Sequence, residues 1–191
     1  MRIVGGRFKG RVLSSFRGTS IRPTSDKVRE AVFNILPRDF PFKKALDLFA
    51  GSGALGIEAL SRGAEEAVFI DSDPKAVELV RKNLASCGLL DAASIYRKDA
   101  LSAVRLLSGK GLRFGLIFID PPYASALAEQ TLKAIAAAGL LDEDGVIVAE
   151  TSKRNPIEEA PPGLVLLDRR KYGDTLVYFY TGPSAANGGE P

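Results

Sequence analysis

The sequence predicts an α/β fold with a doubly wound, mostly parallel sheet and a small N-terminal extension. From Lys43 onward, short apolar runs alternate with longer amphipathic segments, as in right-handed βαβ units. Near the C-terminus, two apolar runs flank Tyr172-Gly173-Asp174, which is typical of an antiparallel hairpin. The chain has 191 residues, 46% of them hydrophobic, and can therefore bury one substantial core.

The first 40 residues form an extension that does not follow the βα alternation. Residues 1–6 and 11–15 are predicted to pair as short strands, and a helix is predicted over residues 26–36, capped by Thr24 or Ser25 and ended by Pro37. Although the net charge of the chain is only +3, this segment is strongly basic, which favours an anionic partner. Its cations up to residue 30 are Arg2, Arg7, Lys9, Arg11, Arg17, Arg22, Lys27 and Arg29, against Asp26 and Glu30.

Residues 41–181 are predicted to form the main domain, and the small, polar residues 182–191 a mobile tail. Three of the predicted helices are followed by a glycine stop, at Gly63, Gly88 or Gly139. The predicted parallel strands are 45–49, 67–70, 94–97, 114–119 and 146–150, the helices between them are near 54–61, 74–86, 100–107 and 126–138, and the hairpin strands are 164–169 and 176–180.

The composition excludes several kinds of chemistry. The chain has no histidine, so Ser-His-Asp triads, Cys-His pairs and imidazole-zinc sites are excluded, and we expect no metal. The single cysteine, Cys87, is expected to be a buried filler. No apolar run reaches the roughly 18–20 residues that span a bilayer, and the N-terminus lacks a signal-peptide core. We therefore expect a cytoplasmic protein with no membrane partner, and a monomer because no long apolar stripe is present.

A glycine-rich turn follows the first predicted strand. Gly51, Gly53 and Gly56 satisfy G-x-G-x-x-G, in which glycines let a ligand approach the backbone and the next helix offers free N–H groups. Asp71 lies twenty positions after Gly51, where a carboxylate can accept both ribose hydroxyls. The glycine turn, the helix that follows it and Asp71 together predict a site for an adenosine-containing cofactor. A structural glycine turn with a capping acid is the alternative.

Asp47 distinguishes between adenosine cofactors. A carboxylate beside the glycine turn would repel the pyrophosphate of a dinucleotide, whereas S-adenosylmethionine carries a sulfonium and an ammonium cation. The sequence therefore favours methyl transfer over hydride transfer. Asp99, just before Ala100, either bonds the adenine amino group or caps the following helix, and Asp73 before Pro74 is predicted to be an N-cap.

Asp120-Pro121-Pro122-Tyr123 follows the apolar run 116–119. The two prolines hold the neighbouring backbone carbonyls stiffly as acceptors. A planar base could lie against the Tyr123 ring while Asp120 and a prolyl carbonyl accept its amino hydrogens. The tetrapeptide thus predicts recognition of an NH2 group, with a plain proline turn as the alternative. No catalytic role is assigned to the acids Glu58 and Glu150.

These motifs resemble the RsmD-type RNA methyltransferases, which modify a guanine N2 amino group in small-subunit ribosomal RNA. The resemblance spans about residues 2–180, and residues 22–34 (RPTSDKVREAVFN) are its most family-specific part. The glycine loop and the Asp-Pro-Pro-Tyr step are shared by many amino-group methyltransferases. Tyr123 stands where Phe is the family alternative, and either residue offers a stacking face. The remaining matching segments are 3–10, 47–64 and 120–123.

The resemblance implies a Rossmann-like, class I S-adenosylmethionine-dependent methyltransferase with a seven-stranded, mostly parallel sheet and an antiparallel last strand. It implies a cofactor site at the carboxyl ends of the first three strands and a target-base site after the fourth. The expected partner is ribosomal RNA or an assembling small subunit. Candidate cofactor-binding residues are Asp47, Phe49, Gly51, Gly53, Asp71, Asp99 and Ala100, candidate catalytic residues are Asp120, Pro121, Pro122 and Tyr123, and candidate RNA-binding residues are Arg7, Lys9, Arg11 and Arg22.

The sequence leaves two kinds of alternative open. The same amine chemistry could serve adenine N6 in DNA or RNA, or a protein glutamine. From a different class, a nicotinamide-dependent oxidoreductase or a non-catalytic RNA-binding Rossmann domain would also contain the glycine turn.

Overall fold

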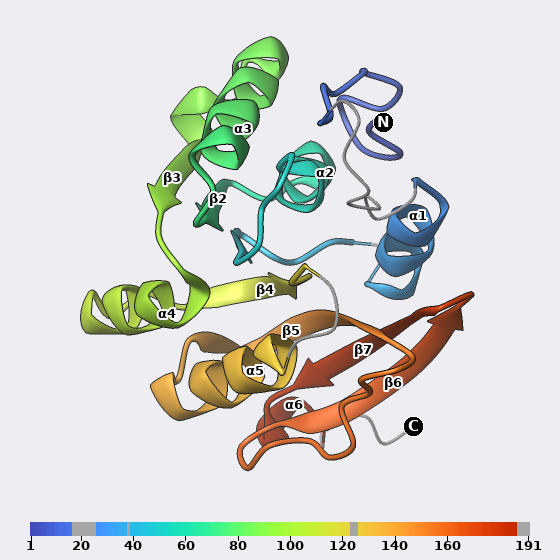
Figure 1. Ribbon diagram of the computed structural model, residues 1–191, viewed down its shortest axis with the longest axis vertical. Helices are drawn as coiled ribbons and strands as arrows, with labels where there is room; N and C mark the ends of the chain where they lie inside the picture. Colours follow the sequence, from blue (N-terminus) through green and yellow to red (C-terminus); the bar gives the residue numbers. More distant parts are fainter. Residues whose placement is uncertain (17–25, 38, 123–125, 187–191) are drawn as a thin grey trace.

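The computed structural model describes residues 1–16, 26–37, 39–122 and 126–186, which form a seven-stranded sheet with helices on both faces (Figure 1). The strand order is β3-β2-β1-β4-β5-β7-β6, with β1 to β5 parallel and β7 antiparallel to both of its neighbours. The expected α/β sheet with an antiparallel last strand is confirmed. The strands are β1 (Lys44–Asp47), β2 (Glu66–Asp71), β3 (Ala93–Arg97), β4 (Phe114–Ile119), β5 (Leu141–Ser152), β6 (Val165–Tyr172) and β7 (Thr175–Thr181).

The helices begin and end at the local signals that the sequence contains. The Asp73 side chain accepts a 2.9 Å hydrogen bond from the Lys75 N–H ahead of Pro74, which confirms the predicted N-cap. Gly88 ends the same helix in a left-handed conformation, at φ 67°. The helices are α1 (Asp26–Ile35), α2 (Ala54–Arg62), α3 (Pro74–Cys87), the 3₁₀ helix η1 (Leu90–Ala92), α4 (Ala100–Gly109), α5 (Leu127–Ala138) and α6 (Pro183–Ala186).

Alternate side chains of the central strands face two separate apolar layers. In β4, Leu116 and Phe118 pack in the layer that includes α1, α2 and α3, whereas Ile117 and Ile119 pack against α4 and α5. All six residues of β4 are buried, because both faces of a central parallel strand are covered. Cys87 is 3% exposed in the first layer, as expected of a buried filler.

The N-terminal extension packs against α2. The two predicted N-terminal strands meet as a single antiparallel bridge between Arg2 and Val12. Ile3 and Leu13 are each 2% exposed and belong to the same apolar layer as the sheet. The bridge and its turn, residues 1–13, are called the N-terminal hairpin below, and Figure 1 shows the hairpin beside α2 and α1.

A buried carboxylate joins the hairpin to α1 and α2. The Glu58 side chain is fully buried on α2 and accepts a 2.8 Å hydrogen bond from the Val4 N–H. Its second oxygen lies 2.9 Å from Arg62 Nε, and the buried Arg29 of α1 lies 3.6 Å from the first. Arg29 also donates to the Arg2 carbonyl. Glu58 is therefore a structural junction between segments that are far apart in the sequence.

Some boundaries differ from those predicted. The first strand ends at Asp47 rather than at residue 49, and the fifth begins at Leu141 rather than at residue 146. Within the segment that the sequence predicts to be a mobile tail, Pro183–Ala186 forms the short helix α6, and the mobility of the tail stays a prediction. The predicted caps Thr24 and Ser25 and the last five residues lie outside the described residues. No helix in the described part of the chain is long and apolar enough to cross a membrane.

We predict that Glu58→Ala lowers the free energy of unfolding by about 3–5 kcal/mol, because the buried Arg29 loses its buried carboxylate partner and keeps only the half-exposed Asp26. Urea denaturation measures the change. Glu66→Ala is the matched control, since its 3.3 Å pair with Lys44 is exposed and should change the same quantity by only about 0–1 kcal/mol. Equal effects of the two substitutions would contradict the structural role of Glu58.

Candidate functional site

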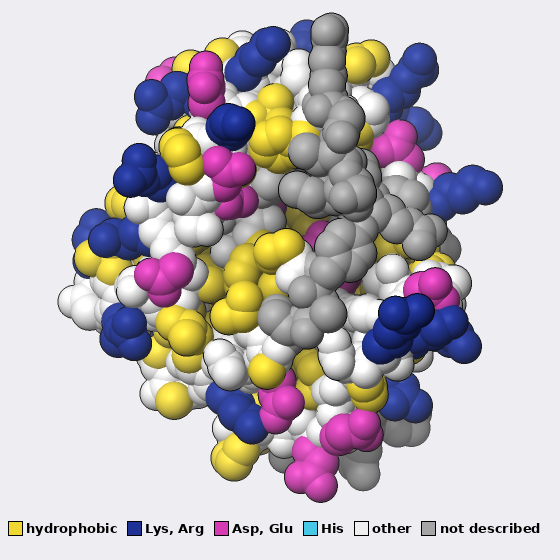
Figure 2. All heavy atoms as spheres, in the orientation of Figure 1, with side chains coloured by type: hydrophobic (Ala, Val, Ile, Leu, Met, Phe, Trp, Pro, Cys, Tyr) yellow, Lys and Arg dark blue, Asp and Glu magenta, His cyan; other side chains and the backbone are white. Residues whose placement is uncertain are grey.

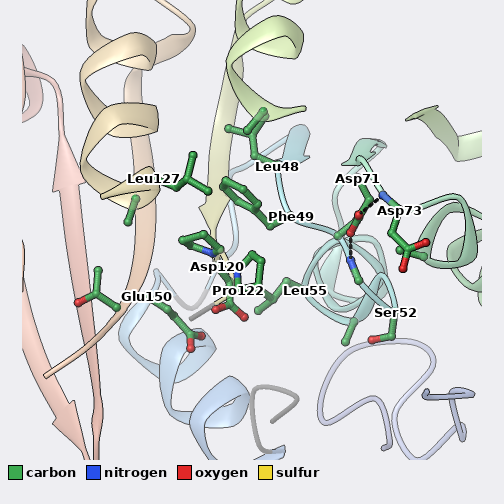
Figure 3. Close-up of a pocket in the computed structure, with 18 of the residues that line it drawn as sticks. Leu48, Phe49, Ser52, Leu55, Asp71, Asp73, Asp120, Pro122, Leu127 and Glu150 are labelled. Atoms are coloured by element: carbon green, nitrogen blue, oxygen red, sulfur yellow. Dashed lines mark hydrogen bonds between the residues drawn. The ribbon is translucent and has the colours of Figure 1, made fainter. Parts of the chain in front are cut away.

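A cavity of about 610 Å³ opens at the carboxyl ends of β1, β2, β4 and β5. Its lining comes from the glycine loop, the strand ends, the start of α5, the tip of the β6–β7 hairpin and the N-terminal segment. Figure 3 shows lining side chains from the glycine loop, the strand ends and the start of α5. Ligands of open parallel sheets bind at this edge.

The strand register aligns four cavity residues in one row. Continuing the observed pairing by one or two positions places Asp71, Phe49, Asp120 and Glu150 side by side on β2, β1, β4 and β5. Figure 3 shows the same succession across the cavity. We call these four residues the floor row. The defining register pairs are Asp47–Phe69, Asp47–Phe118 and Ile119–Ala149.

The glycine loop is held by the acid at the end of β2. Asp71 accepts a hydrogen bond of 2.8 Å from the Gly51 N–H and one of 2.9 Å from the Asp73 N–H. Gly51 and Gly53 adopt left-handed φ values of 54° and 79°, which turn the chain into α2. Each Asp71 oxygen keeps a second lone pair, so the residue can still accept ligand hydroxyl groups. Gly51 and Asp71 line the cavity, whereas Gly53 is buried and is not among the lining residues.

Asp47 lies beneath the cavity and is 1% exposed. One of its oxygens accepts a 3.3 Å hydrogen bond from the Gly56 N–H, and the other has no hydrogen-bond partner among the described residues. Burial, assisted by the neighbouring carboxylates of Asp120 and Asp71, raises the pKa of Asp47 to about 7, although the Gly56 hydrogen bond acts in the opposite direction. Because side chains two positions apart share one face, Asp47 stands one layer below Phe49. Direct contact between Asp47 and a cofactor remains a prediction.

The remaining predicted cofactor residues are at the cavity wall. Asp99 accepts a 2.9 Å hydrogen bond from the Ser102 N–H and caps α4, and this bond lowers the pKa of Asp99 below its usual range. The helix-cap interpretation is therefore confirmed, while Asp99 also lines the cavity beside Ala100. Phe49 presents its ring to the same space (Figure 3).

The Asp-Pro-Pro-Tyr step begins where β4 ends, as predicted. Asp120, Pro121 and Pro122 line the cavity, and Tyr123 lies outside the described residues. The apolar side chain of Leu55 lies next to Pro122 in Figure 3, and Leu127 also lines the cavity, on the side of Phe49 away from Leu55. This end of the cavity therefore combines carboxylate acceptors with apolar walls, an arrangement suited to a flat, amine-bearing ring.

Three cations of the basic N-terminal segment, which we call the basic arm, are exposed on the N-terminal hairpin. Arg7, Lys9 and Arg11 are all exposed, and the guanidinium carbons of the two arginines lie 4.7 and 5.6 Å from the Phe8 ring centroid. Arg22 lies outside the described residues. Figure 2 shows Lys and Arg side chains round the margin of one face of the molecule and apolar side chains nearer its middle.

The sequence did not reveal that the N-terminal segment lines the cavity, through Met1, Ser15 and Phe16. The buried Asn83 of α3 holds this segment to the glycine loop. Its amide nitrogen donates to the Ser14 carbonyl at 3.0 Å and to the Ser52 carbonyl at 2.8 Å, and its oxygen accepts from the Ser14 N–H. No local pattern signals contacts between residues 69 positions apart.

Glu150 was also missed as a cavity residue. It is 7% exposed, stands at the end of the floor row and lines the cavity. An acid near the end of a buried strand was the available signal, since Asp71 and Asp120 occupy the same kind of position. Other lining residues that the sequence did not indicate include Lys98, Leu101, Asn155, Tyr172, Asp174 and Thr175.

The strand order, the antiparallel β7 and the glycine loop beside an acidic cavity define a Rossmann-like methyltransferase fold. The solved structure named "Putative methyltransferase yhhF from Escherichia coli" superimposes with a TM-score of 0.83 and 34% sequence identity, over 96% of this chain and 98% of that one. The model of the family "Conserved hypothetical protein 95" matches residues 1–181, and the chain belongs to this family.

Two relatives agree with the resemblance seen in the motifs. The chain is 43% identical to "Putative rRNA methyltransferase YlbH" of Bacillus subtilis, over 94% of this chain and 98% of that protein. It is 35% identical to "Ribosomal RNA small subunit methyltransferase D" of Escherichia coli, over 93% of this chain and 87% of that protein. The expected RsmD-type family is confirmed.

The raised pKa of Asp47 predicts a specific pH dependence of stability. Since this acid titrates near 3.8 in the unfolded chain and near 7 in the folded protein, its contribution to stability is complete below pH 4 and is lost as the pH rises through 7. The neutral Asp47→Asn lacks this titration. The free energy of unfolding of the variant should therefore rise relative to the parent by a few kcal/mol between about pH 4 and 8.

Urea denaturation at steps of about one pH unit across that window measures this difference. Other groups titrate equally in both proteins, so their contributions cancel in the difference between the two free energies of unfolding. A difference that stays constant with pH would show that Asp47 is not protonated in the folded state.

Proposed function

We propose that this protein is an S-adenosylmethionine-dependent methyltransferase that modifies the exocyclic N2 amine of a guanine in small-subunit (16S) ribosomal RNA. The observation that carries the proposal is the floor row. Its first member, Asp71, adjoins the glycine loop, and Asp120, further along the row, precedes the rigid prolines, so one cavity can hold a methyl donor beside an amine. The family membership and the names of the relatives support the ribosomal substrate.

The acids round the glycine loop fit S-adenosylmethionine better than a dinucleotide. Asp71 would accept the ribose hydroxyls, and Asp99 with the Ala100 backbone would meet the adenine. Asp47 adds a buried oxygen without a hydrogen-bond partner among the described residues, which is an unfavourable neighbour for a pyrophosphate and a favourable one for a cation. This observation argues against the nicotinamide alternative. When bound, the cofactor supplies a methyl group carried on a sulfonium.

At the other end of the cavity, Asp120 and the Pro121 carbonyl would accept the two hydrogens of the target amine. The lone pair of such an amine is delocalised into its ring, so the acceptors serve to aim it at the methyl carbon. Positive charge would develop on the amine nitrogen as it takes the methyl group from the sulfonium, and the Asp120 carboxylate would stabilise that charge. A proton then leaves the nitrogen to Asp120 or to water.

Positioning should dominate the rate enhancement. Holding two reactants in line can contribute about 7–11 kcal/mol, whereas removal of a proton by a positioned base typically gives about 10²–10⁴-fold. Tyr123 would complete the base site by stacking on the ring, as the resemblance implies. The apolar Leu55 and Leu127 would exclude water beside it.

Nucleoside analysis after incubation with labelled S-adenosylmethionine tests the function. We expect N2-methylguanosine from small-subunit rRNA or ribosomal subunits, and no methylated adenosine from the same RNA or from DNA. Asp120→Asn should lower turnover by about 10²-fold or more, since it removes the carboxylate charge, while calorimetric affinity for S-adenosylmethionine changes little. Label in adenosine or protein, or near-normal turnover by the variant, would contradict the proposal.

The basic arm should bind the RNA backbone. We predict that changing Arg7, Lys9 and Arg11 together to Glu weakens RNA binding by about 10²-fold or more at physiological salt and flattens its dependence on salt, because phosphate contacts release counterions. Filter binding from 50 to 200 mM salt measures both effects. Lys43, Lys44 and Lys133, which form exposed ion pairs elsewhere, provide a control triple substitution to Glu. If both triple variants lose affinity equally, the arm is not the binding element.

A further inference from the structure

We infer that Glu150 selects guanine over adenine at the target-base site by accepting the guanine N1–H. The inference rests on the proposed function, because it specifies what the amine end of the same cavity recognises. It gives a role in specificity to a residue for which the sequence indicated none.

The sheet places Glu150 immediately beside Asp120. Ile119 of β4 and Ala149 of β5 are register partners, so the next residue on each strand is Asp120 and Glu150 respectively. Side chains at paired positions of parallel strands point to the same face. Figure 3 shows both carboxylates directed toward the cavity next to Pro122.

The Glu150 backbone is held rigidly within the sheet. It is paired with Val177 of β7 on one side and continues the β4 register on the other. Val177 is fully buried, and Glu150 itself is 7% exposed. Binding groups on strands are held more precisely than groups on loops, which is what discrimination between two bases requires.

The Watson–Crick edge of guanine matches this pair of acids. It presents two amine hydrogens on N2 and, on the adjacent ring atom, the N1–H. If Asp120 and the Pro121 carbonyl accept the amine hydrogens, the N1–H points to the neighbouring acceptor, which the register identifies as Glu150. Ionised carboxylates are acceptors only, so both acids suit an edge that carries only donors at these positions.

Adenine would not fit the same arrangement. Its amine lies next to N1, which carries a lone pair and no hydrogen, so N1 would face the Glu150 carboxylate without a hydrogen bond. Two acceptors that face each other repel, and a site built to hydrogen-bond a ligand N–H rejects an analogue that lacks it by about 10⁴–10⁵-fold. Glu150 would therefore exclude adenine N6, an acceptor that the Asp-Pro-Pro-Tyr chemistry alone does not exclude.

The test compares two bases that share the N2 amine but differ at N1, and also at position 6, where only guanine carries an oxygen; the Glu150 variant isolates the N1 contribution. Once nucleoside analysis and primer extension have located the methylated guanine, a ligated transcript can carry 2-aminopurine there, whose N1 accepts a hydrogen bond. We expect kcat/KM of the unchanged protein to be at least about 10²-fold higher for guanine than for 2-aminopurine. Glu150→Gln should lower that ratio at least about tenfold, because its amide can donate to N1 of 2-aminopurine while guanine exchanges a charged acceptor for a weaker, neutral one.

The matched control is Glu143→Gln, on an exposed stretch of the same strand, which should leave the ratio unchanged. Calorimetry with S-adenosylmethionine should give the same affinity for Glu150→Gln as for the unchanged protein. A ratio unaltered by Glu150→Gln would overturn the inference. So would equal methylation of the two bases by the unchanged protein, a result that needs no folded variant. Failure of the unchanged protein to form N2-methylguanosine would instead overturn the proposed function.

Discussion

The buried carboxylate of Glu58 is the contact on which the arrangement of the molecule depends. It lies on α2, the helix that leaves the glycine loop, and it accepts the Val4 N–H while pairing with Arg62 and with the buried Arg29. Burying one carboxylate and one guanidinium is costly unless each is compensated by the other. The hairpin, α1 and α2 therefore assemble together, and the N-terminal segment reaches the cavity as a consequence.

The carboxyl edge of the sheet concentrates acids around one cavity. Asp71, Asp120 and Glu150 belong to the floor row, and Asp47 lies one layer below, where burial and its neighbours raise its pKa to about 7. Such an arrangement is unfavourable for an anionic ligand and favourable for a cationic methyl donor and a donor-rich base edge. The same electrostatic argument thus applies to the binding of the methyl donor and to the binding of the target base.

The proposed RNA-binding and cofactor-binding regions are physically continuous. Asn83 bonds both Ser14, just after the basic hairpin, and Ser52 of the glycine loop. In addition, the Arg11 side chain donates to the Ser86 carbonyl at the end of α3. The cations that would hold phosphates are therefore attached to the elements that shape the cavity, so an RNA held by the arm would lie close to the cavity opening.

The sequence by itself determined the succession of strands and helices along the chain and the position of the glycine loop. It also indicated the acids Asp71 and Asp99 and the start of the Asp-Pro-Pro-Tyr step. These follow from hydrophobic periodicity and turn chemistry, which act over a few residues. Only the tertiary structure placed Asp47 beneath the cavity, Glu58 at the junction with the hairpin and Glu150 beside Asp120. Those positions depend on strand register and on packing between segments far apart in the chain, because the same residue type is exposed, structural or ligand-facing according to what packs against it.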